Sequence, residues 1–150
     1  WISEGEAILK ETKGLGKDYQ RSGNSVAMVI FDNYREYRFA DQLRIPVVAA
    51  QRRRYKASCW VRLFSEEQAE ASVRVSLNLI DPNTPQPHAA DGSIVSRDWA
   101  VVETEVVTPC DAPTLMIDVQ SDRLPASGSH HQWILSIDDV NLTPLPSQTK

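Results

Sequence analysis

Two runs in this chain, residues 53–64 and residues 71–80, alternate between small or apolar side chains and a second set that includes large planar groups. Trp60 belongs to the first run, and Arg74 and Asn78 belong to the second. Side chains on a strand alternate between its faces, so each run predicts a strand with one apolar face and one face of planar groups. An indole ring offers a flat apolar surface, while guanidinium and amide groups donate hydrogen bonds in fixed directions. Together they suit a ligand rich in hydroxyl groups, such as a sugar, and we expect both strands to present them on one sheet.

Further polar and aromatic residues are expected to extend this surface. Residues 114–121 alternate in the same way, and their outward side chains extend the surface if that face adjoins Trp60. Two tyrosines flank the turn at residues 35–36. We expect Trp60 to be the main stacking platform; the alternative is that Trp60 covers a small second core beneath a loop and that the arginines are solvated. The candidate sugar-contacting residues are Trp60, Arg62, Arg74, Asn78, Gln42, Asp118, Gln120, Tyr34 and Tyr37.

The residues that could carry out catalysis do not form a recognisable site. The three histidines fall in predicted loops, and no nucleophile motif accompanies them. Two carboxylates for glycoside hydrolysis would have to face one groove roughly 5–10 Å apart. Asp118 and Asp122 share a strand face, but strand geometry places them about 13 Å apart. The sequence therefore predicts a binding protein and not an enzyme.

The composition indicates a single domain with no general affinity for nucleic acid. The chain has 150 residues, of which 41% are hydrophobic, and this is enough to enclose one core. Its net charge of −4 argues against nucleic acid as a partner, and the lack of a run of eighteen apolar residues argues against a membrane span.

Positive charge is concentrated at residues 52–54 and Lys56. We interpret this cluster as the solvated start of a strand, with a phosphate or sulfate site as the alternative.

Turn and breaker residues divide the chain into about eight short extended runs. Such runs, separated by turns, are typical of an all-β protein built as an antiparallel sandwich. We expect the sandwich to cover residues 1–142, and residues 143–150 to form a linker or tail. The predicted strands are residues 7–11, 25–31, 37–45, 53–64, 71–80, 99–107, 114–121 and 133–142. The predicted core comprises Val26, Met28, Ile30, Val61, Leu63, Val73, Val75, Leu77, Ile117, Val119, Leu135 and Ile137.

Four segments occur in an order found in a known group of proteins. They are Ser-Gly-Asn-Ser-Val at 22–26, Tyr-Lys-Ala-Ser-Cys-Trp-Val-Arg at 55–62, Trp99 with the alternating residues after it, and Ile-Asp-Asp-Val-Asn-Leu at 137–142. Over nearly its whole length the chain resembles carbohydrate-binding modules of the jelly-roll type, in particular those of families four, nine, sixteen and twenty-two.

The resemblance implies a galactose-binding-like jelly roll that holds a polysaccharide or oligosaccharide on a concave sheet face. Such modules are usually attached to a glycoside hydrolase, so it also implies a covalently linked catalytic domain and a secreted or cell-surface location. We expect a monomer with no nucleic-acid or membrane partner. The alternative is a structural sandwich that packs against a neighbouring catalytic domain and binds no sugar. The arginines suit uronic or sulfated sugars as well as neutral ones.

The resemblance also implies a structural calcium ion, held in part by an acidic residue of a first strand of the type Asn-x-x-Phe-Glu. This chain begins at Trp1, where that strand would end. Asp138 and Asp139 could supply calcium ligands; alternatively, the pair marks a bulge at the start of a final edge strand. Cys59 and Cys110 could form one disulfide or remain two free thiols.

Overall fold

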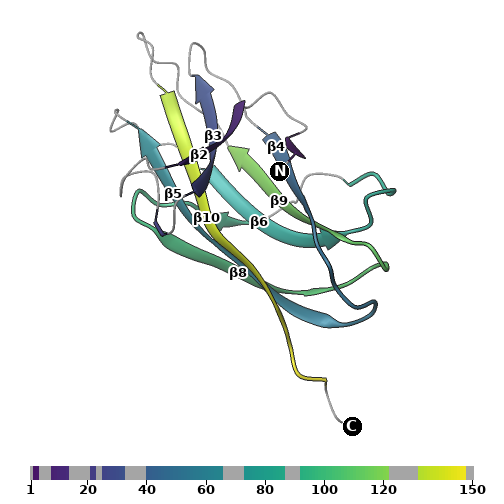
Figure 1. Cartoon of the computed structure of the whole chain (residues 1–150). Helices are drawn as coiled ribbons and strands as arrows, with labels where there is room; N and C mark the ends of the chain where they lie inside the picture. The colour runs from purple at the N-terminus through teal and green to yellow at the C-terminus, as the bar shows by residue number, and fades with distance from the viewer. Residues whose placement is uncertain are drawn as a thin grey trace.

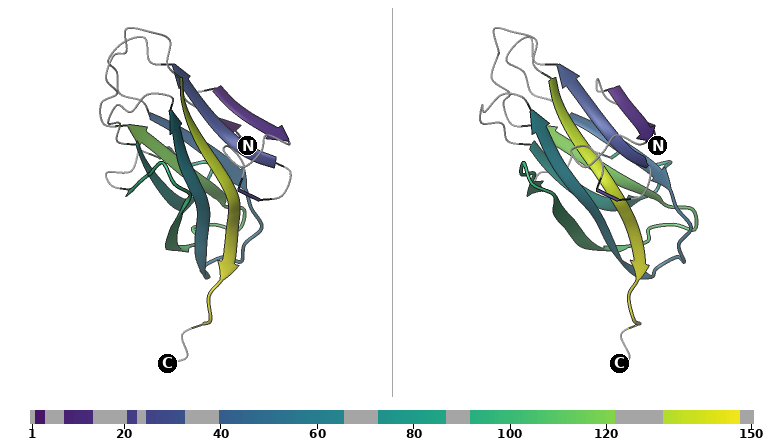
Figure 2. Two further views of the ribbon diagram at one scale, coloured as in Figure 1. Left: turned by 90° about the vertical axis from the view of Figure 1, so that its left-hand side faces the viewer. Right: turned by 60° about the vertical axis from the view of Figure 1, so that its left-hand side comes forward.

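In the computed structural model the chain forms two antiparallel sheets that pack face to face, as Figures 1 and 2 show. The structure describes residues 2–3, 8–13, 21–22, 25–32, 40–65, 73–86, 92–121 and 132–147. Its strands in these ranges are β1 (Ile2–Ser3), β2 (Ile8–Lys13), β3 (Ser25–Asp32), β4 (Ala40–Pro46), β5 (Arg54–Ser65), β6 (Val73–Ile80), β7 (Ser93–Ile94), β8 (Ala100–Val107), β9 (Thr114–Ser121) and β10 (Gln132–Pro144).

Each sheet has five strands, and we name each sheet after its central strand. The β9 sheet has the order β1-β4-β9-β6-β7, and the β10 sheet has the order β2-β3-β10-β5-β8. The prediction of an antiparallel sandwich is therefore confirmed, with two additional strands of two residues each, β1 and β7. In the ranges described, no helix is long and apolar enough to cross a membrane.

The core lies between the two sheets and is built from the alternating positions that the sequence indicates. Nine of the predicted core residues are buried in one cluster, and they come from β5, β6, β9 and β10. Met28 is buried too, but it lies outside this cluster. Its register partner Ser136 alternates with the core residues Leu135 and Ile137, so Met28 belongs to the outer face of the β10 sheet. The prediction that Met28 faces the sandwich core is wrong, because alternation defines two faces and not which one points inward. The side chains of Val26 and Ile30 lie outside the described residues.

The two strands that were expected to lie side by side belong to different sheets. β5 pairs with β10 and β8, whereas β6 pairs with β9 and β7. The prediction of one shared face is therefore wrong. Alternation correctly predicts the two faces of each strand but does not predict which strands pair. A strand in either layer of a sandwich buries one face and exposes the other. Consecutive strands can thus alternate identically and still face opposite sides of the molecule.

The acidic pair in β10 marks an irregularity in a central strand. The register of β10 against β5 shifts between Asp138 and Asn141, and Asp139 has a φ of 49°. The interpretation of this pair as a bulge is confirmed. Its expected position on an edge strand is wrong, since β10 lies between β3 and β5 (Figure 2). β10 also continues to Pro144, so the strand includes two residues of the predicted tail.

Candidate functional site

The outer face of the β9 sheet carries a three-strand array of polar side chains. Register aligns Gln42 of β4 with Asp118 of β9 and Ser76 of β6. Opposed positions on neighbouring strands are about 5 Å apart, so their side chains lie within contact range. Two flanking rows have the same parity, which places all of these residues on one face. This polar array comprises Gln42, Arg44, Arg74, Ser76, Asn78, Asp118 and Gln120, and the apolar Met116 lies between Arg44 and Asn78.

The polar array is graded from a buried centre to an accessible border. Asp118 is 1% exposed and Gln42 is 6% exposed, although both point away from the sandwich core. Arg74 and Gln120 are half-buried, and Asn78 is exposed. A buried carboxylate needs compensating charge or hydrogen bonds, and the register places Arg44 and Arg74 diagonally on either side of Asp118. The centre therefore forms a fixed polar floor, while the border presents groups that a ligand can reach.

One segment after β6 contributes to the cover over the floor of the array. The Nε2 group of Gln42 donates to the carbonyl oxygen of Gln86 at 3.3 Å, and the Nη2 group of Arg44 donates to Oε1 of Gln42 at 3.4 Å. Residues 81–84 form a turn, in which the backbone N–H groups of Asn83 and Thr84 donate to Asp81. This chain of contacts fixes the orientation of the Gln42 amide, so that its dipole is set before any ligand arrives.

Trp60 and Arg62 lie on the other side of the molecule, on the outer face of the β10 sheet. Trp60 points away from the core, as expected, and is half-buried. The guanidinium carbon of Arg21 lies 3.7 Å from the centroid of the Trp60 ring. Arg62 donates from Nε to the carbonyl oxygen of Arg97 at 2.7 Å. One face of the indole is thus in contact with Arg21, and Trp60 is separated from Arg74 by the thickness of the sandwich.

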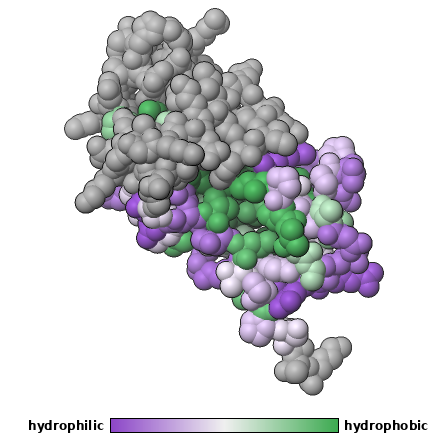
Figure 3. Space-filling model, in the orientation of Figure 1, coloured by the Kyte–Doolittle hydropathy of each residue, from purple (hydrophilic) through white to green (hydrophobic). Residues whose placement is uncertain are grey.

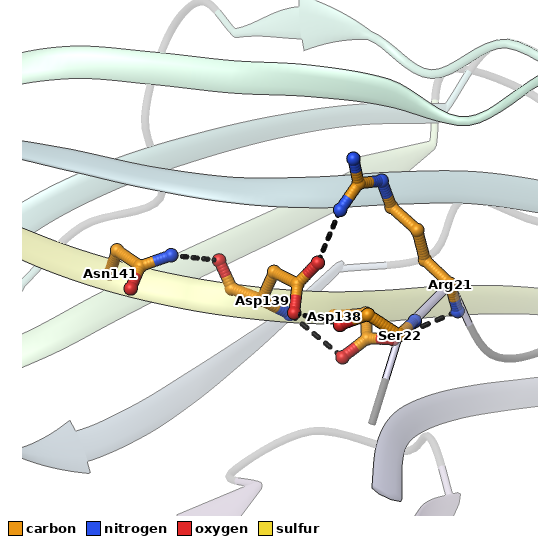
Figure 4. Close-up of polar contacts among 5 residues, drawn as sticks. All are labelled: Arg21, Ser22, Asp138, Asp139 and Asn141. Carbon is orange, nitrogen blue, oxygen red and sulfur yellow. Dashed lines mark hydrogen bonds and ion pairs between the residues drawn. The ribbon is translucent and has the colours of Figure 1, made fainter. Parts of the chain in front are cut away.

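Arg21 and Ser22 are tied to the acidic pair of β10, as Figure 4 shows. Oδ2 of Asp138 accepts from the backbone N–H groups of Arg21 and Ser22 at 2.9 and 3.0 Å. Oδ1 of the same residue accepts from the N–H of Asp139 at 2.8 Å. Asp139 forms an ion pair with Nη1 of Arg21 at 2.5 Å and accepts from the hydroxyl of Ser22. We call this set of contacts the Arg21 clip.

The Arg21 clip bears on the predicted calcium site. Calcium requires six to eight oxygen ligands with free lone pairs. In the clip, the carboxylate of Asp138 faces three N–H groups, and that of Asp139 faces a guanidinium group. Within the ranges the structure describes, no three acidic, histidine or cysteine side chains gather as a metal-binding group. The arrangement of these two aspartates does not fit a calcium ion, and calcium stays a prediction.

The structure thus brings together five of the nine candidate residues, Arg74, Asn78, Gln42, Asp118 and Gln120, and separates Trp60 and Arg62 from them. Tyr34 and Tyr37 lie outside the described residues. Sequence reasoning missed Arg44 and Arg21. Arg44 has the same parity as Gln42, so alternation could have identified it, whereas nothing in the sequence relates Arg21 to Trp60.

The two cysteines do not form a disulfide: Cys59 is buried and Cys110 is partly exposed, and both are free thiols.

Several solved structures share this architecture. The carbohydrate-binding module TmCBM61, solved in complex with beta-1,4-galactotriose, aligns with a TM-score of 0.62 at 17% identity over 97% of this chain and 88% of its own. The CBM22-1 xylan-binding domain of Paenibacillus barcinonensis Xyn10C aligns at 0.58 and 10% identity over 98% and 86% of the two chains. The CBM22-1–GH10 modules of Clostridium thermocellum Xyn10B, complexed with xylohexaose, align at 0.56 and 15% identity over 100% of this chain and 27% of theirs.

The sequence itself matches neither a protein-family model nor a curated protein. At identities this low, the structural likeness establishes the fold and leaves the ligand to be argued from the residues. The chain is an antiparallel β-sandwich with the jelly-roll architecture of carbohydrate-binding modules.

Proposed function

We propose that the polar array on the β9 sheet binds a polysaccharide or oligosaccharide without catalysing its breakdown. The observation that carries this proposal is the convergence of Gln42, Asp118 and Arg74 with two further amides across three neighbouring strands. Guanidinium and amide groups can engage vicinal hydroxyls from both sides, and the hydrogen bond to Gln86 orients the Gln42 amide. The sugar complexes of similarly folded modules support the choice of ligand.

Tyr34 and Tyr37, which lie outside the described residues, are the remaining candidates for aromatic stacking at this site. In the sequence they precede β4, whose first residue, Ala40, pairs with Gln120 of the polar array. A tyrosine ring provides the flat apolar surface that a pyranose needs, with a hydroxyl at its rim. We assign the stacking role to these tyrosines in preference to Trp60, because Trp60 lies on the opposite layer.

The biological role that fits this binding is to hold an attached glycan-active enzyme near its substrate. Tethering raises the local concentration of substrate, so a modest affinity is sufficient. One structural neighbour pairs a module of this fold with a GH10 module, which supports a covalently linked catalytic domain. With this role we propose a secreted or cell-surface location and a monomeric state. We include no calcium in the proposed binding site.

A structural role without sugar binding is the second candidate. It is favoured by exposed valines on the edge strand β8, where Val101 is 44% exposed and Val107 is 56% exposed. Figure 3 also shows an apolar area bordered by hydrophilic side chains on the face turned to the viewer. A face of this kind would suit packing against a neighbouring domain.

Affinity electrophoresis through gels that contain galactan, xylan, polygalacturonate or heparin tests the proposal. We expect at least one neutral polymer to retard the protein, and Asn78→Ala to weaken that retardation by about tenfold through loss of the amide hydrogen bonds to the sugar. Asn141→Ala is the matched control, because Asn141 is also exposed but lies on β10. If Asn78→Ala and Asn141→Ala are retarded equally, the array is not the binding face. If no neutral polymer retards the parent protein, the structural role is the better account.

A further inference from the structure

Three consecutive arginines line a cavity at one end of the sandwich. The C-terminal segment leaves the sandwich at this end (Figure 1). The cavity has a volume of about 500 Å³. One wall is residues 50–54, which end the connection from β4 and begin β5, and the other is residues 145–147, which follow β10. The two walls are joined by a hydrogen bond from the N–H of Leu145 to the carbonyl oxygen of Arg54 at 3.0 Å. This volume lies within the range of small-ligand pockets and is large enough for a sugar residue.

The arginine-bearing wall is held in place by buried groups beneath it. The hydroxyl of Thr108 accepts from the N–H of Arg53 at 3.0 Å and donates to the carbonyl oxygen of Ala50 at 2.5 Å. The hydroxyl of Tyr55 accepts from the N–H of Ala50 at 2.9 Å. Thr108 and Tyr55 are 2% and 7% exposed. The backbone of the turn is therefore organised by the fold itself, which lowers the entropy cost of binding a ligand there.

Arg52 adopts a backbone conformation that is unfavourable for its residue type. Its φ is 57°, in the left-handed region where a side chain with a Cβ atom is strained. Strain of this kind persists where surrounding contacts impose it, and it concentrates at binding sites. Here the N–H of Arg52 donates to the carbonyl oxygen of Thr108 at 3.3 Å, which contributes to the constraint.

Among the described residues, no carboxylate neutralises two of the three guanidinium groups. Arg54 forms an ion pair with Glu105. Arg53 lies 5.9 Å from the ring centroid of Tyr55, a contact that leaves its charge in place. In the part of the chain that the structure describes, neither Arg52 nor Arg53 has a carboxylate within ion-pair distance, and both side chains are exposed. Two adjacent positive charges thus border a preorganised cavity in a chain whose net charge is −4.

We propose that this arginine pocket binds the sulfate or carboxylate group of an acidic polysaccharide. The paired guanidinium forks match the oxygen geometry of both groups, and Leu145 and Pro146 offer apolar contact to the sugar ring. The pocket lies at one end of the sandwich and not on the face of the β9 sheet, so it constitutes a second site. Its existence does not depend on neutral-glycan binding by the polar array.

Affinity electrophoresis at low salt tests the arginine pocket with heparin as the sulfated polymer and polygalacturonate as the carboxylated one. The test protein carries Arg52→Asn with Arg53→Gln, because asparagine tolerates a positive φ and the turn should stay folded. The control protein carries Lys56→Gln with Arg97→Gln, which removes an equal number of positive charges from residues outside the pocket. Thermal unfolding shows whether both proteins are folded.

We expect at least one acidic polymer to retard the parent protein, and the polymer that does so identifies the anionic group. The affinity of the test protein should fall by about tenfold or more, as expected for the loss of charge-assisted hydrogen bonds, and that of the control protein by much less. An equal fall in both proteins would reveal a general charge effect and overturn the proposal, as would a parent protein that neither acidic polymer retards. Retardation by a neutral polymer reports on the polar array alone, so the two proposals can fail separately.

Discussion

The role of Trp60 decides between two hypotheses, sugar binding on the outer face of the β10 sheet and sugar binding on the polar array. Trp60 is half-buried, and one face of its ring is in contact with Arg21. A guanidinium group over an indole contributes roughly 0.5–1 kcal/mol at an exposed position. The Arg21 clip adds backbone hydrogen bonds to Asp138 that do not depend on the ring. Trp60 therefore has a structural task on the β10 sheet that is independent of any ligand.

For this reason Trp60→Ala should lower the melting temperature by several degrees and leave retardation by a neutral glycan unchanged. The expected loss of about 1–2 kcal/mol includes the contact with Arg21 and the apolar area of the ring. Calorimetry and affinity electrophoresis on one preparation provide both values. Arg21→Ala is the control: it removes the contact with the ring and keeps the indole, so it separates the contribution of the contact to stability from that of the ring. If Trp60→Ala lost glycan retardation at an unchanged melting temperature, Trp60 would be the stacking platform after all.

The two cysteines should differ sharply in reactivity. Burial in the sandwich core raises the pKa of the Cys59 thiol from its ordinary value near 9 to about 12. In the folded protein at pH 8, a thiol reagent should modify Cys110 readily and Cys59 only after denaturation, because the thiolate is the reactive form. The unfolded chain releases the Cys59 proton at a lower pH than the native one, so this group makes stability fall as pH rises from about 9 to 12. Rapid modification of folded Cys110→Ser would contradict the burial of Cys59.

At the scale of elements, the short strand β7 depends on a glycine beside it. A Cβ atom at Gly92 would lie 3.0 Å from the carbonyl oxygen of Val75, and this oxygen belongs to the backbone of β6. Gly92→Ala should therefore displace β7 and destabilise the protein by about 1–3 kcal/mol, as overpacking does. Urea unfolding measures the change, with Ser93→Ala as an exposed neighbouring control. An unchanged midpoint for Gly92→Ala would mean that β6 and β7 separate at little cost.

The strands illustrate how far alternation reaches. It correctly assigns the buried face of β5, β6, β9 and β10, because a period of two follows from strand geometry alone. It does not specify neighbours, which depend on how the chain crosses from one layer to the other between residues 65 and 73. Residues 114–121 were expected to extend the polar surface on condition that they adjoin Trp60; β9 instead adjoins Arg74 and Asn78, because it pairs directly with β6. Trp60 was wrongly grouped with Arg74, because two strands that are consecutive in the sequence were assumed to pair in the same sheet.

At the scale of the whole molecule, the proposed functions occupy different surfaces. The polar array lies on the outer face of one layer, the Arg21 clip stabilises the outer face of the other, and the arginine pocket lies at one end. The order of motifs along the chain was sufficient to predict the jelly roll, since that order reflects the succession of strands. The contact between Arg21 and Trp60 joins positions 39 residues apart, and neither composition nor periodicity carries information about such a pairing.

The position of β10 also determines how the protein can be made in a cell. β3 and β5 flank β10 and do not pair with each other, so both keep an unpaired edge until β10 has left the ribosome. The segment from β3 to β10 must be synthesised before that layer closes, and pairings between such distant segments form slowly. During this interval the exposed edges offer templates for association with other nascent chains. The yield of folded protein should therefore depend more on whether chaperones cover these two edges than on the speed of translation.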